Sequence, residues 1–536
     1  MNLLTVTSGT CLRTRAERQP HEIALIDADT GRVFSWALLQ SEVDAVAAGF
    51  VASGLKKGDR LGIWSANSPE FVILYLAAAR LGIIVVCINF HFKQKEMEEL
   101  LSEAQLNALC FSEGFRDNRF NPILTSLAQK NARGLPALLI SIYSHPDAFG
   151  LSLSDLKGRG KEVSALELSA MESSVECHDP VVILLTSGST ARPKRVLLSH
   201  HNIINNAKHS SASLNVTEED VLCLVVPFFH CFGLVSGLYF SLLTGCQLVM
   251  LRNYHIEDLL KTIQRYKCTV LHGVPTIFNR LIHHNARCEY DISSLKKGIL
   301  AGAHCPPSLV RNIYSQLEMD DISVCWGQTE TSPCCTQTLI NDPLETKCNS
   351  IGKPLPFVEM KVINTKNGEQ CGCGIKGEMC TRGYHVMQGY DGDPQQTAQV
   401  IDSEGWFHTG DIGYVDVDGY YHYVLRKKEV IIRGGENVSP REIEDAILEY
   451  PAIDSAFVFG MSSEELGEEI AAAVCVKINE VVSESALTCF LRQRLARYKL
   501  PQYIFFFSTF PLTPCGKVDV QKIRLLTAEL QSKCIE

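Results

Sequence analysis

The sequence predicts an α/β protein: a large N-terminal domain of layered, mostly parallel sheets covered by helices, followed by a small α+β C-terminal domain. From residue 60 onward, short runs of β-branched residues alternate with segments of helical length. Alternation of this kind is typical of parallel sheets with helices on their faces. The chain has 536 residues, more than one hydrophobic core usually supports, so we expect several domains.

The first strand, helix and strand give the clearest signal. Residues 60–64 form a predicted strand, Ser68 and Pro69 open a helix, and Gly82 closes it before the next strand at residues 83–88. The same rhythm continues along the chain. We expect strands at residues 181–185, 221–226, 247–251, 269–271, 298–301 and 322–325, and a helix over residues 256–266.

Residues 221–251 contain no Asp, Glu, Lys or Arg over a length that could span a bilayer. However, Pro227, His230 and several glycines interrupt this stretch. We therefore expect a buried strand, loop, helix and strand here, and no transmembrane segment.

Glycine and turn residues between positions 372 and 394 indicate a smaller β-rich subdomain at about residues 350–424. Beyond it the pattern changes to a separate α+β unit. We place the boundary near Lys428, so that residues 1–427 form the N-terminal domain and residues 428–536 the C-terminal domain. In the latter, helices are expected at residues 440–449 and 484–495, and strands at residues 453–459 and 470–476.

Composition excludes some classes of protein. The net charge of −10, without a run of Lys and Arg, offers no surface for a nucleic acid. The 21 cysteines are scattered and show no paired CxxC pattern, so we expect reduced, buried thiols in an intracellular protein.

The N-terminal residues bear on the compartment. The first 19 residues carry three arginines and one acid, a weak similarity to a mitochondrial presequence. We favour the interpretation that residues 11–17 open the first helix of the fold. A cytoplasmic location is therefore favoured, and a mitochondrial one stays open.

The first candidate for chemistry is the segment 181–200, VVILLTSGSTARPKRVLLSH, in which an apolar strand leads into a loop rich in hydroxyls. Backbone N–H groups and hydroxyls can donate to phosphate oxygens, and Lys194 adds positive charge. The GxxxxGK spacing of a Walker loop is absent. On these residues alone, an ordinary surface turn is an equal alternative. The hydroxyls belong to Thr186, Ser187, Ser189 and Thr190.

The second candidate is the segment 321–333, DISVCWGQTETSP, a predicted strand that ends at Trp326 and is followed by Thr329 and Glu330. A carboxylate beside a phosphate loop is a natural ligand of Mg²⁺, which takes one or two protein carboxylates together with phosphate oxygens. A solvated loop residue is the alternative for Glu330.

Two later segments complete the set. Residues 405–411, GWFHTGD, supply Asp411, whose carboxylate can accept both hydroxyls of a ribose, and Arg426 can add a donor. Residues 511–517, PLTPCGK, end on Lys517.

In this order, the four segments resemble the adenylate-forming superfamily of acyl-CoA synthetases, luciferases and nonribosomal adenylation domains. The resemblance covers nearly the whole chain and includes a Pro-x-x-His segment at residues 227–230. Each motif is moderately specific alone, whereas their joint order at similar spacing is highly specific. The resemblance implies ATP, Mg²⁺ and coenzyme A, a small-molecule carboxylic acid as substrate, and a C-terminal domain that moves as a lid.

The resemblance also implies roles for single residues. Thr329 and Glu330 would bind the α-phosphate and Mg²⁺, with Thr190 as a second metal ligand. Lys517 would be the main catalytic cation and would offset the charge that builds as one anion attacks another. The loop on the outer phosphates would comprise Thr186, Ser187, Gly188, Ser189, Thr190, Ala191, Arg192, Pro193 and Lys194. The nucleoside contacts would be Ala303, Trp326, Asp411 and Arg426.

After adenylation, the C-terminal domain of such enzymes rotates about a hinge, which would fall at Lys428. The rotation would remove Lys517 and bring Gly434, Gly435 and Asn437 to the coenzyme A channel. The thiol would then displace AMP from the acyl adenylate.

The family position that lines the acyl pocket is residues 227–230, PFFH. Nearby Phe232 and Leu234 add apolar bulk, and this segment has no Asp to pair with an amino-acid ammonium group, so we expect a hydrophobic acid. Four other stretches look most like medium-chain fatty-acid enzymes: AGAHCPPSLVRNI at residues 301–313, GYHVMQGYDGDPQQT at 383–397, EVIIRGGENVSPREIEDAI at 429–447 and LPQYIFFFSTFPLTPCGK at 500–517. His230 is a candidate catalytic residue, with a core histidine as the alternative.

The chain departs from the family pattern at three positions. Ala191 and Arg195 stand where the phosphate loop usually has glycine, and Leu425 where glycine usually precedes the hinge arginine. If position 191 needs a positive φ, alanine there costs about 1 kcal/mol. We expect an active acyl-CoA ligase. The alternatives are a relative that binds nucleotide or acyl ligands with weak turnover, and a luciferase-like oxygenase.

Overall fold

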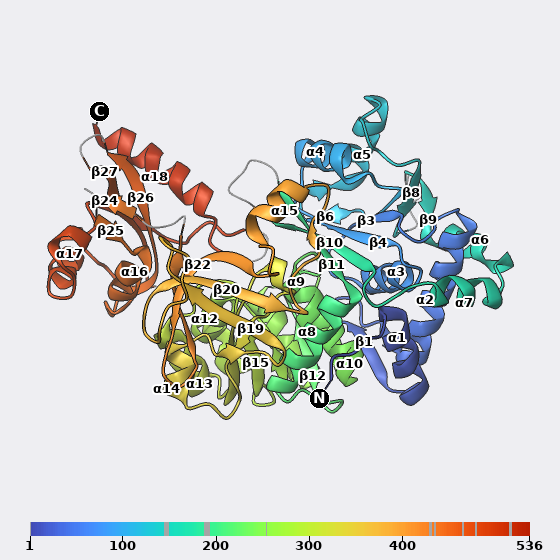
Figure 1. The fold of residues 1–536 in the computed structure, drawn as a ribbon, viewed down its shortest axis with the longest axis horizontal. Coiled ribbons are helices and arrows are strands. Elements are labelled where there is room, and N and C mark those ends of the chain that lie inside the picture. Colours follow the sequence, from blue (N-terminus) through green and yellow to red (C-terminus); the bar gives the residue numbers. More distant parts are fainter. Residues whose placement is uncertain are drawn as a thin grey trace. The chain divides into compact units, whose positions relative to one another are not determined.

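The structure is a computed structural model, and it describes residues 2–143, 149–186, 193–252, 255–427, 431–433, 436–463, 466–477, 480–513 and 517–535 (Figure 1). The chain divides into two compact units, each described by itself. The first unit comprises Met1–Cys348, Gly352–Glu359 and Arg382–Phe407, and the second comprises Asn349–Ile351, Met360–Thr381 and His408–Glu536.

The helices of the first unit are α1 (Ser8–Arg18), α2 (Trp36–Ala52), α3 (Pro69–Arg80), α4 (Gln94–Ala104), α5 (Phe120–Gln129), α6 (Leu153–Arg159), η1 (Gly160–Glu162), α7 (Ala165–Ser173), α8 (His200–Ser213), α9 (Cys231–Gly233), η2 (Leu234–Tyr239), α10 (Phe240–Thr244), α11 (Ile256–Tyr266), α12 (Pro275–His283), η3 (Asn285–Glu289), α13 (Pro307–Gln316), η4 (Thr329–Thr331), α14 (Leu344–Asn349) and α15 (Pro394–Val400). Among these, η2 is a π-helix, and the other η elements are 3₁₀-helices.

A nine-stranded sheet forms one layer of the first unit, in the order β18-β17-β16-β15-β14-β12-β13-β1-β2. Its strands from β16 to β1 pair in parallel, and antiparallel strands border them on both sides. The strands are β1 (Ile23–Asp27), β2 (Val33–Ser35), β12 (Val221–Leu224), β13 (Gln247–Met250), β14 (Val270–Leu271), β15 (Lys297–Leu300), β16 (Asp321–Trp326), β17 (Thr336–Gln337) and β18 (Lys353–Pro354).

An eight-stranded sheet forms the second layer, in the order β21-β11-β10-β4-β3-β5-β8-β9. It is parallel from β10 to β9, while β11 and β21 run antiparallel to their neighbours. The strands are β3 (Arg60–Trp64), β4 (Ile84–Ile88), β5 (Ala108–Phe111), β8 (Leu138–Ser141), β9 (Leu151–Ser152), β10 (Pro180–Thr186), β11 (Lys194–Ser199) and β21 (Gly389–Tyr390), and a separate small hairpin joins β6 (Gly114–Phe115) to β7 (Asn118–Arg119).

Helix α3 shows how local signals and burial agree in this unit. Ser68 accepts a hydrogen bond from the Phe71 N–H at its start, Pro69 occupies the first turn, and Gly82 follows its end at a φ of 71°. Every residue of α3 is buried, and the helix packs against α1, α2 and β4. Its side chains from Phe71 to Ala79 belong to one hydrophobic core that runs through the first unit.

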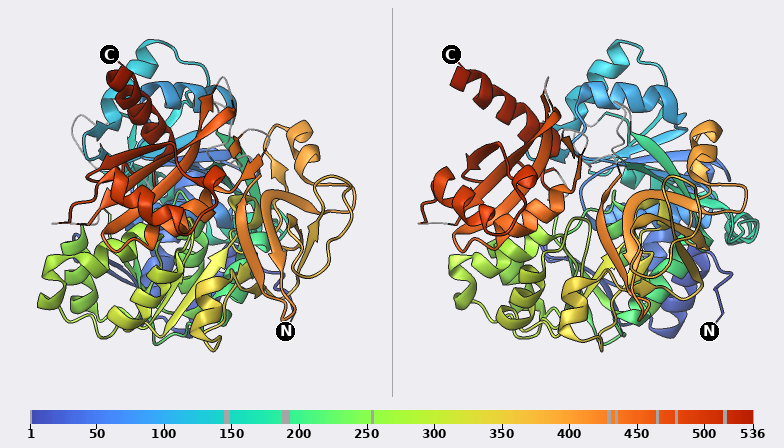
Figure 2. Two further views of the ribbon diagram at one scale, coloured as in Figure 1. Left: turned by 90° about the vertical axis from the view of Figure 1, so that its left-hand side faces the viewer. Right: turned by 60° about the vertical axis from the view of Figure 1, so that its left-hand side comes forward.

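The second unit contains a four-stranded and a five-stranded sheet, drawn in orange to red in Figures 1 and 2. The five-stranded sheet places Ile470, Ala472 and Val474 on the face covered by α16 (Pro440–Leu448) and α17 (Glu484–Arg492). Ala471 and Ala473 lie on the opposite face, which is covered by α18 (Val520–Ile535). This alternation is the period of two that a strand imposes.

The strands of the second unit are β19 (Val358–Ile363), β20 (Gly377–Gly383), β22 (Phe407–Val415), β23 (Tyr421–Arg426), β24 (Ile431–Arg433), β25 (Glu436–Val438), β26 (Ile453–Ser463), β27 (Gly467–Val476) and β28 (Tyr503–Phe507). Its helices are α16 (Pro440–Leu448), α17 (Glu484–Arg492), η5 (Arg497–Lys499) and α18 (Val520–Ile535).

The predicted fold class is confirmed: a large unit of parallel sheets with helices, a β-rich segment and a small α+β part. The bounds differ in places. For example, β26 extends to Ser463 because it pairs with β27 as far as Gly467, whereas the sequence predicted an end at residue 459. The predicted division at Lys428 lies outside the described residues. The division therefore stays a prediction.

The expectation of buried thiols is wrong for three cysteines, because Cys288, Cys373 and Cys489 are exposed. Within the described ranges the cysteines are free of disulfide bonds, as predicted. Among the same residues, no helix is long and apolar enough to cross a membrane.

Candidate active site

Glu330, Tyr390 and Lys194 form a connected polar cluster in the first unit. Glu330 lies just after β16 of the nine-stranded sheet, and the other two residues lie on adjacent strands β11 and β21 of the eight-stranded sheet. The Tyr390 hydroxyl donates to Glu330 Oε1 at 2.9 Å, and Lys194 Nζ donates to the same hydroxyl at 3.2 Å. Lys194 Nζ also lies 4.7 Å from the centre of the Tyr390 ring. The cluster thus joins the two sheets.

Electrostatics fix the protonation of Tyr390. Burial and the neighbouring Glu330 carboxylate raise the pKa of Tyr390 well above its ordinary value. The hydroxyl therefore keeps its proton and donates a hydrogen bond to Glu330, while its oxygen accepts a hydrogen bond from Lys194. This arrangement sets an ammonium group and a buried carboxylate on either side of one hydroxyl.

The chain around Glu330 is held by its backbone. A Cβ on Gly327 would lie 1.8 Å from the Pro333 carbonyl oxygen, so this close turn requires glycine. The Met387 N–H donates to the Glu330 carbonyl at 2.9 Å. Glu330 itself is only 8% exposed. The carboxylate is therefore positioned by a tight turn and is not the solvated loop residue of the alternative interpretation.

Thr186 and Lys194 form the base of the predicted phosphate loop. They are directly paired as the last residue of β10 and the first of β11, in an antiparallel hairpin. Pro193, which precedes Lys194, is half-buried. The loop residues Ser187, Gly188, Ser189, Thr190, Ala191 and Arg192 lie outside the described residues.

Arg195, one of the departures from the family pattern, anchors this hairpin. Its guanidinium bonds Glu103 Oε2 at 2.6 Å through Nη1, Asp391 Oδ2 at 3.1 Å through Nε, and the Asp391 carbonyl at 2.9 Å through Nη2. Arg60 also pairs with Asp391, at 2.7 Å. The Arg195 side chain therefore ties β11 to α4 and to the turn after β21.

The two residues predicted to contact the adenine follow adjacent parallel strands. Trp326 ends β16 and is half-buried, while Ala303 lies exposed in the loop after β15. Because Leu300 of β15 pairs with Val324 of β16, both segments emerge at the same edge of the sheet. The carboxyl edge of a parallel sheet is where ligands of α/β proteins commonly bind.

His230 lies at the start of α9, after β12 of the same sheet, and is half-buried. Its ring lies 4.3 Å from that of Phe229, which meets Phe90 edge-on at 4.9 Å. Phe228 stacks on Phe71 at 5.1 Å. The predicted acyl segment is thus embedded in aromatic side chains, and His230 sits at the margin of that cluster.

The second unit holds the predicted ribose ligand. Asp411 on β22 is 3% exposed, and Arg426 on the paired strand β23 donates from Nε to Asp411 Oδ1 at 3.0 Å. Thr409 Oγ1 accepts from the Asp411 N–H at 3.1 Å. Glu378 accepts from the Gly410 N–H at 3.1 Å and pairs with Lys427. The carboxylate of Asp411 is therefore fixed by its neighbours on the sheet.

Lys517 is exposed in the same unit, and its N–H donates to Thr513 Oγ1 at 3.2 Å. Asn437 lies on β25, paired with Ile432 of β24. The predicted hinge residue Lys428 and the predicted channel residues Gly434 and Gly435 lie outside the described residues.

The structure thus connects two of the predicted sets: Lys194 with Glu330 through the Tyr390 hydroxyl, and Asp411 with Arg426 by a direct hydrogen bond. Sequence reasoning missed Tyr390 and Glu378. Tyr390 lies in the stretch GYHVMQGYDGDPQQT, whose family likeness was noted without a role for this residue. Its position became clear only from the pairing of β21 with β11.

The donor set around Glu330 fits Mg²⁺. A hard carboxylate oxygen is the ligand that this ion prefers, and the Lys194 ammonium nearby favours the phosphate groups that supply its other ligands. Thr190, the second predicted metal ligand, lies outside the described residues.

Comparisons with known proteins agree with this geometry. The AMP-binding enzyme family matches residues 12–391, and the C-terminal domain of AMP-binding enzymes matches residues 442–517. The chain therefore belongs to the AMP-binding enzyme family, as an AMP-forming acid–thiol ligase of the acyl-CoA synthetase class.

Two curated relatives cover nearly all of it. YngI of Bacillus subtilis, which carries the name of an acyl-CoA synthetase, is 34% identical over 98% of this chain and 98% of its own. The mitochondrial medium-chain acyl-CoA ligase ACSF2 of Mus musculus is 35% identical over 98% of this chain and 88% of its own.

A solved structure shares the fold. ATP-bound MatB from Rhodopseudomonas palustris is 26% identical, covers 97% of this chain and 99% of its own, and superposes with a TM-score of 0.84.

Proposed function

We propose that this enzyme activates a hydrophobic, medium-chain fatty acid with ATP and transfers the acyl group to coenzyme A. The observation that carries the proposal is the connected cluster of Lys194, Tyr390 and Glu330, which joins the two sheets of the first unit. It combines a cation for phosphate with a buried carboxylate for a metal ion, which nucleotide activation requires.

The proposed acid is hydrophobic because aromatic side chains surround the acyl segment. Phe228 and Phe229 are buried and pack against Phe71 and Phe90. Burial of apolar surface favours an alkyl chain by about 0.8 kcal/mol for each methylene group. The name of the mouse relative, a medium-chain acyl-CoA ligase, supports the choice of chain length.

In the first half-reaction, an oxygen of the substrate carboxylate attacks the α-phosphorus of ATP. A new carboxylate–phosphorus bond forms, the bond to the β-phosphate oxygen breaks, and pyrophosphate leaves. We assign the outer phosphates to residues 186–194, the α-phosphate to Thr329, and the metal site to Glu330 and Thr190. Bound Mg²⁺ supplies charge neutralisation on the phosphate oxygens.

Lys517 is assigned the role of main catalytic cation. A carboxylate and a phosphate repel each other as they approach, and an ammonium group placed between them lowers that barrier. Asp411 and Arg426 are assigned to the ribose, Trp326 and Ala303 to the adenine. His230 is assigned to the border of the acyl pocket.

In the second half-reaction, the sulfur of coenzyme A attacks the acyl carbonyl, its proton passes to solvent, and AMP leaves as the bond to the phosphate oxygen breaks. We assign the channel to Gly434, Gly435 and Asn437, where glycine permits close backbone approach. The hinge between the two half-reactions is assigned to Lys428.

The deciding measurement is release of pyrophosphate and AMP with ATP, Mg²⁺ and coenzyme A across a series of straight-chain acids. The wild type is compared with Lys517→Ala and with Lys522→Ala as a matched control that carries the same change five positions along the chain. Release that depends on the acid, peaks at medium chain length and is lost only in Lys517→Ala is the expected result.

Two other results would overturn parts of the proposal. Release that peaks with short-chain or long-chain acids removes the proposed chain length but keeps the ligase. If the protein binds ATP but releases no pyrophosphate or AMP with any acid, the ligase proposal fails. The alternative is then a relative with weak turnover, as Ala191 and Arg195 suggest.

A further inference from the structure

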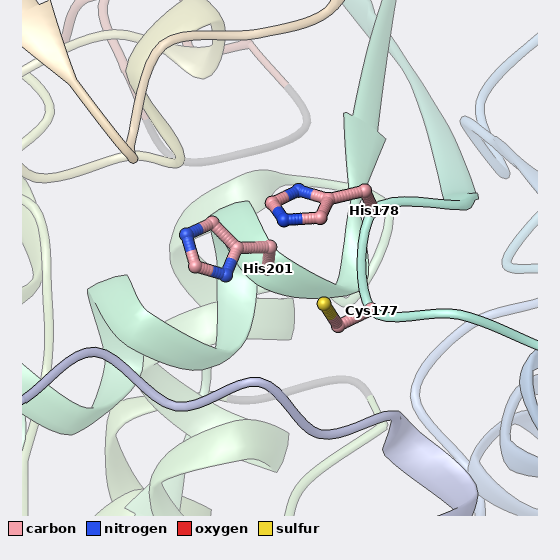
Figure 3. Close-up of side chains that lie close together, drawn as sticks. All are labelled: Cys177, His178 and His201. Carbon is pink, nitrogen blue, oxygen red and sulfur yellow. The ribbon is translucent and has the colours of Figure 1, made fainter.

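Cys177, His178 and His201 converge in the first unit, away from the nucleotide cluster. Cys177 and His178 lie in the turn that precedes β10, and His201 lies in the first turn of α8 (Figure 3). One potential ligand atom from each side chain lies within 4.8 Å of the other two. The two imidazole rings are 4.5 Å apart between centres.

Backbone hydrogen bonds hold the two segments together independently of these side chains. The His201 N–H donates to the Cys177 carbonyl at 2.7 Å, and the next residue pair, His200 and Asp179, is joined at 3.3 Å. Gln388 Nε2 donates to the His178 carbonyl at 2.7 Å. The three side chains are therefore presented by a scaffold that already exists without a metal ion.

The three residues occupy a defined place in the hairpin of β10 and β11. Pro180 at the start of β10 pairs with Ser199 at the end of β11. Cys177 and His178 lead into that first position, and His201 follows the last one. The cluster thus closes the open end of the hairpin, whose other end carries the predicted phosphate loop after Thr186.

We propose that Cys177, His178 and His201 form a zinc-binding site that cross-links the open end of this hairpin. A thiolate and two imidazoles are the ligand types that Zn²⁺ prefers, whereas Mg²⁺ prefers oxygen. Bond lengths of about 2.0–2.3 Å in a tetrahedral site place ligand atoms roughly 3.3–3.6 Å apart. Side-chain movements of about 1 Å would bring the ligand atoms, now within 4.8 Å of one another, to that spacing.

The fourth position of the site is open to water, because His178 is exposed and Cys177 and His201 are half-buried. On binding, the Cys177 thiol releases its proton to solvent and the thiolate bonds the ion. Figure 3 shows the Cys177 sulfur and the rings of His178 and His201 grouped together beside the start of α8. Coordination through His201 Nδ1 replaces its 3.2 Å contacts with the Leu4 carbonyl and with Asn205 Nδ2, while Asn205 still bonds Leu4 at 2.7 and 3.0 Å.

The site is tested on the full chain, stripped of metal, by titration with Co²⁺ and displacement with Zn²⁺. A thiolate bound to Co²⁺ gives a sulfur-to-metal charge-transfer band in the near ultraviolet, which ligation by histidine alone does not give. The wild type is expected to show this band at one Co²⁺ per chain, and Zn²⁺ is expected to abolish it.

Two variants test whether these residues bind the metal ion. Cys177→Ser is expected to lose the band, and His178→Gln to bind Zn²⁺ at least about 100-fold more weakly, since second-shell changes alone cost 10–100-fold. Because His178 is exposed, its variant should keep the melting temperature of the metal-free wild type. Cys489→Ser, which removes another exposed cysteine, is the matched control and should retain the band.

The expected stability readout is a rise in Tm with Zn²⁺ in the wild type and in Cys489→Ser, and no rise in the two site variants. A band that persists in Cys177→Ser, equal zinc affinity in His178→Gln, or no band in the wild type overturns the proposal. Pyrophosphate release is measured separately, so failure of this site leaves the ligase activity untouched.

Discussion

Tyr390 connects the two charged side chains to which phosphate and metal roles are assigned. Its hydroxyl donates to Glu330 and accepts from Lys194, and the raised pKa keeps the proton in place. Glu330 is buried, so loss of a donor leaves its carboxylate less well satisfied. Tyr390, to which the sequence pattern assigns no role, thus positions Glu330 and Lys194, to which the pattern does assign roles.

Tyr390→Phe should lower the rate of ATP–pyrophosphate exchange by about 10- to 100-fold, which corresponds to roughly 1.4–2.8 kcal/mol of lost transition-state stabilisation. The ring remains, so the fold should be kept. Tyr314→Phe, at an exposed tyrosine of α13, is the control and should behave as wild type. An unchanged exchange rate in Tyr390→Phe would show that Glu330 and Lys194 do not depend on this hydroxyl.

Arg195 gives a second argument at this scale. The family usually has glycine here, and the sequence alone suggested that arginine weakens the loop. In the structure its side chain is 15% exposed and bonds both Glu103 and Asp391. Since Asp391 is 7% exposed, the arginine now belongs to a partly buried ion network.

Arg195→Gly should therefore lower the free energy of unfolding by about 1–3 kcal/mol, because Glu103 and Asp391 lose a partner. Denaturant unfolding measures this loss. Arg311→Ala, which breaks the exposed pair with Glu345, should cost no more than about 1 kcal/mol. A glycine variant as stable as the wild type and faster in turnover would favour the idea that arginine impairs the loop.

At the scale of elements, the turn from β16 into η4 shows what sequence reasoning reached and what it did not. The strand and the carboxylate after it were predicted, because an apolar run followed by Thr329 and Glu330 is a local pattern. The close approach of Gly327 to Pro333 was not, since it depends on how the chain returns through β17.

Gly327→Ala should lower stability by about 1–3 kcal/mol and adenylation by at least about tenfold, because its Cβ displaces the turn that carries Glu330. Thermal unfolding and pyrophosphate exchange measure the two effects. In Gly158→Ala, the new Cβ meets no atom within 4 Å in α6, so full activity and equal or greater stability are expected. If both variants behaved alike, the turn would tolerate a side chain and the argument would fail.

At the scale of the whole molecule, the fold class followed from the alternation of strands and helices, which is a repeated local signal. The motifs were found because each is contiguous. Contacts across the sequence could not be predicted: Tyr390 meets Lys194 through the pairing of β11 with β21, and His201 meets Cys177 across a hairpin. Such contacts depend on strand register, for which one sequence gives no direct signal.

Two buried histidines indicate how the stability of the whole molecule depends on pH. His272 and His385 are fully buried in the first unit, and burial lowers the pKa of each from 6.5 to about 3. Between these values, unfolded chains bind protons that the folded protein does not, so unfolding free energy rises with pH in this window. The part of the stability that requires these two histidines to be neutral is fully present above pH 6.5 and is lost as the pH falls toward about 3.

Urea unfolding from pH 7.5 downward should therefore show stability falling below about pH 6.5, by up to about 1.4 kcal/mol per pH unit for each such histidine. In the wild type, His272 Nδ1 accepts a hydrogen bond from the Ile299 N–H at 3.0 Å. His272→Asn keeps an acceptor for this N–H and removes the titratable imidazole. The slope of its unfolding free energy against pH should be smaller than that of the wild type, by an amount that corresponds to at most one bound proton. His283→Asn, at an exposed histidine of α12, is the control. Equal slopes in wild type and His272→Asn would assign the acid sensitivity to other groups.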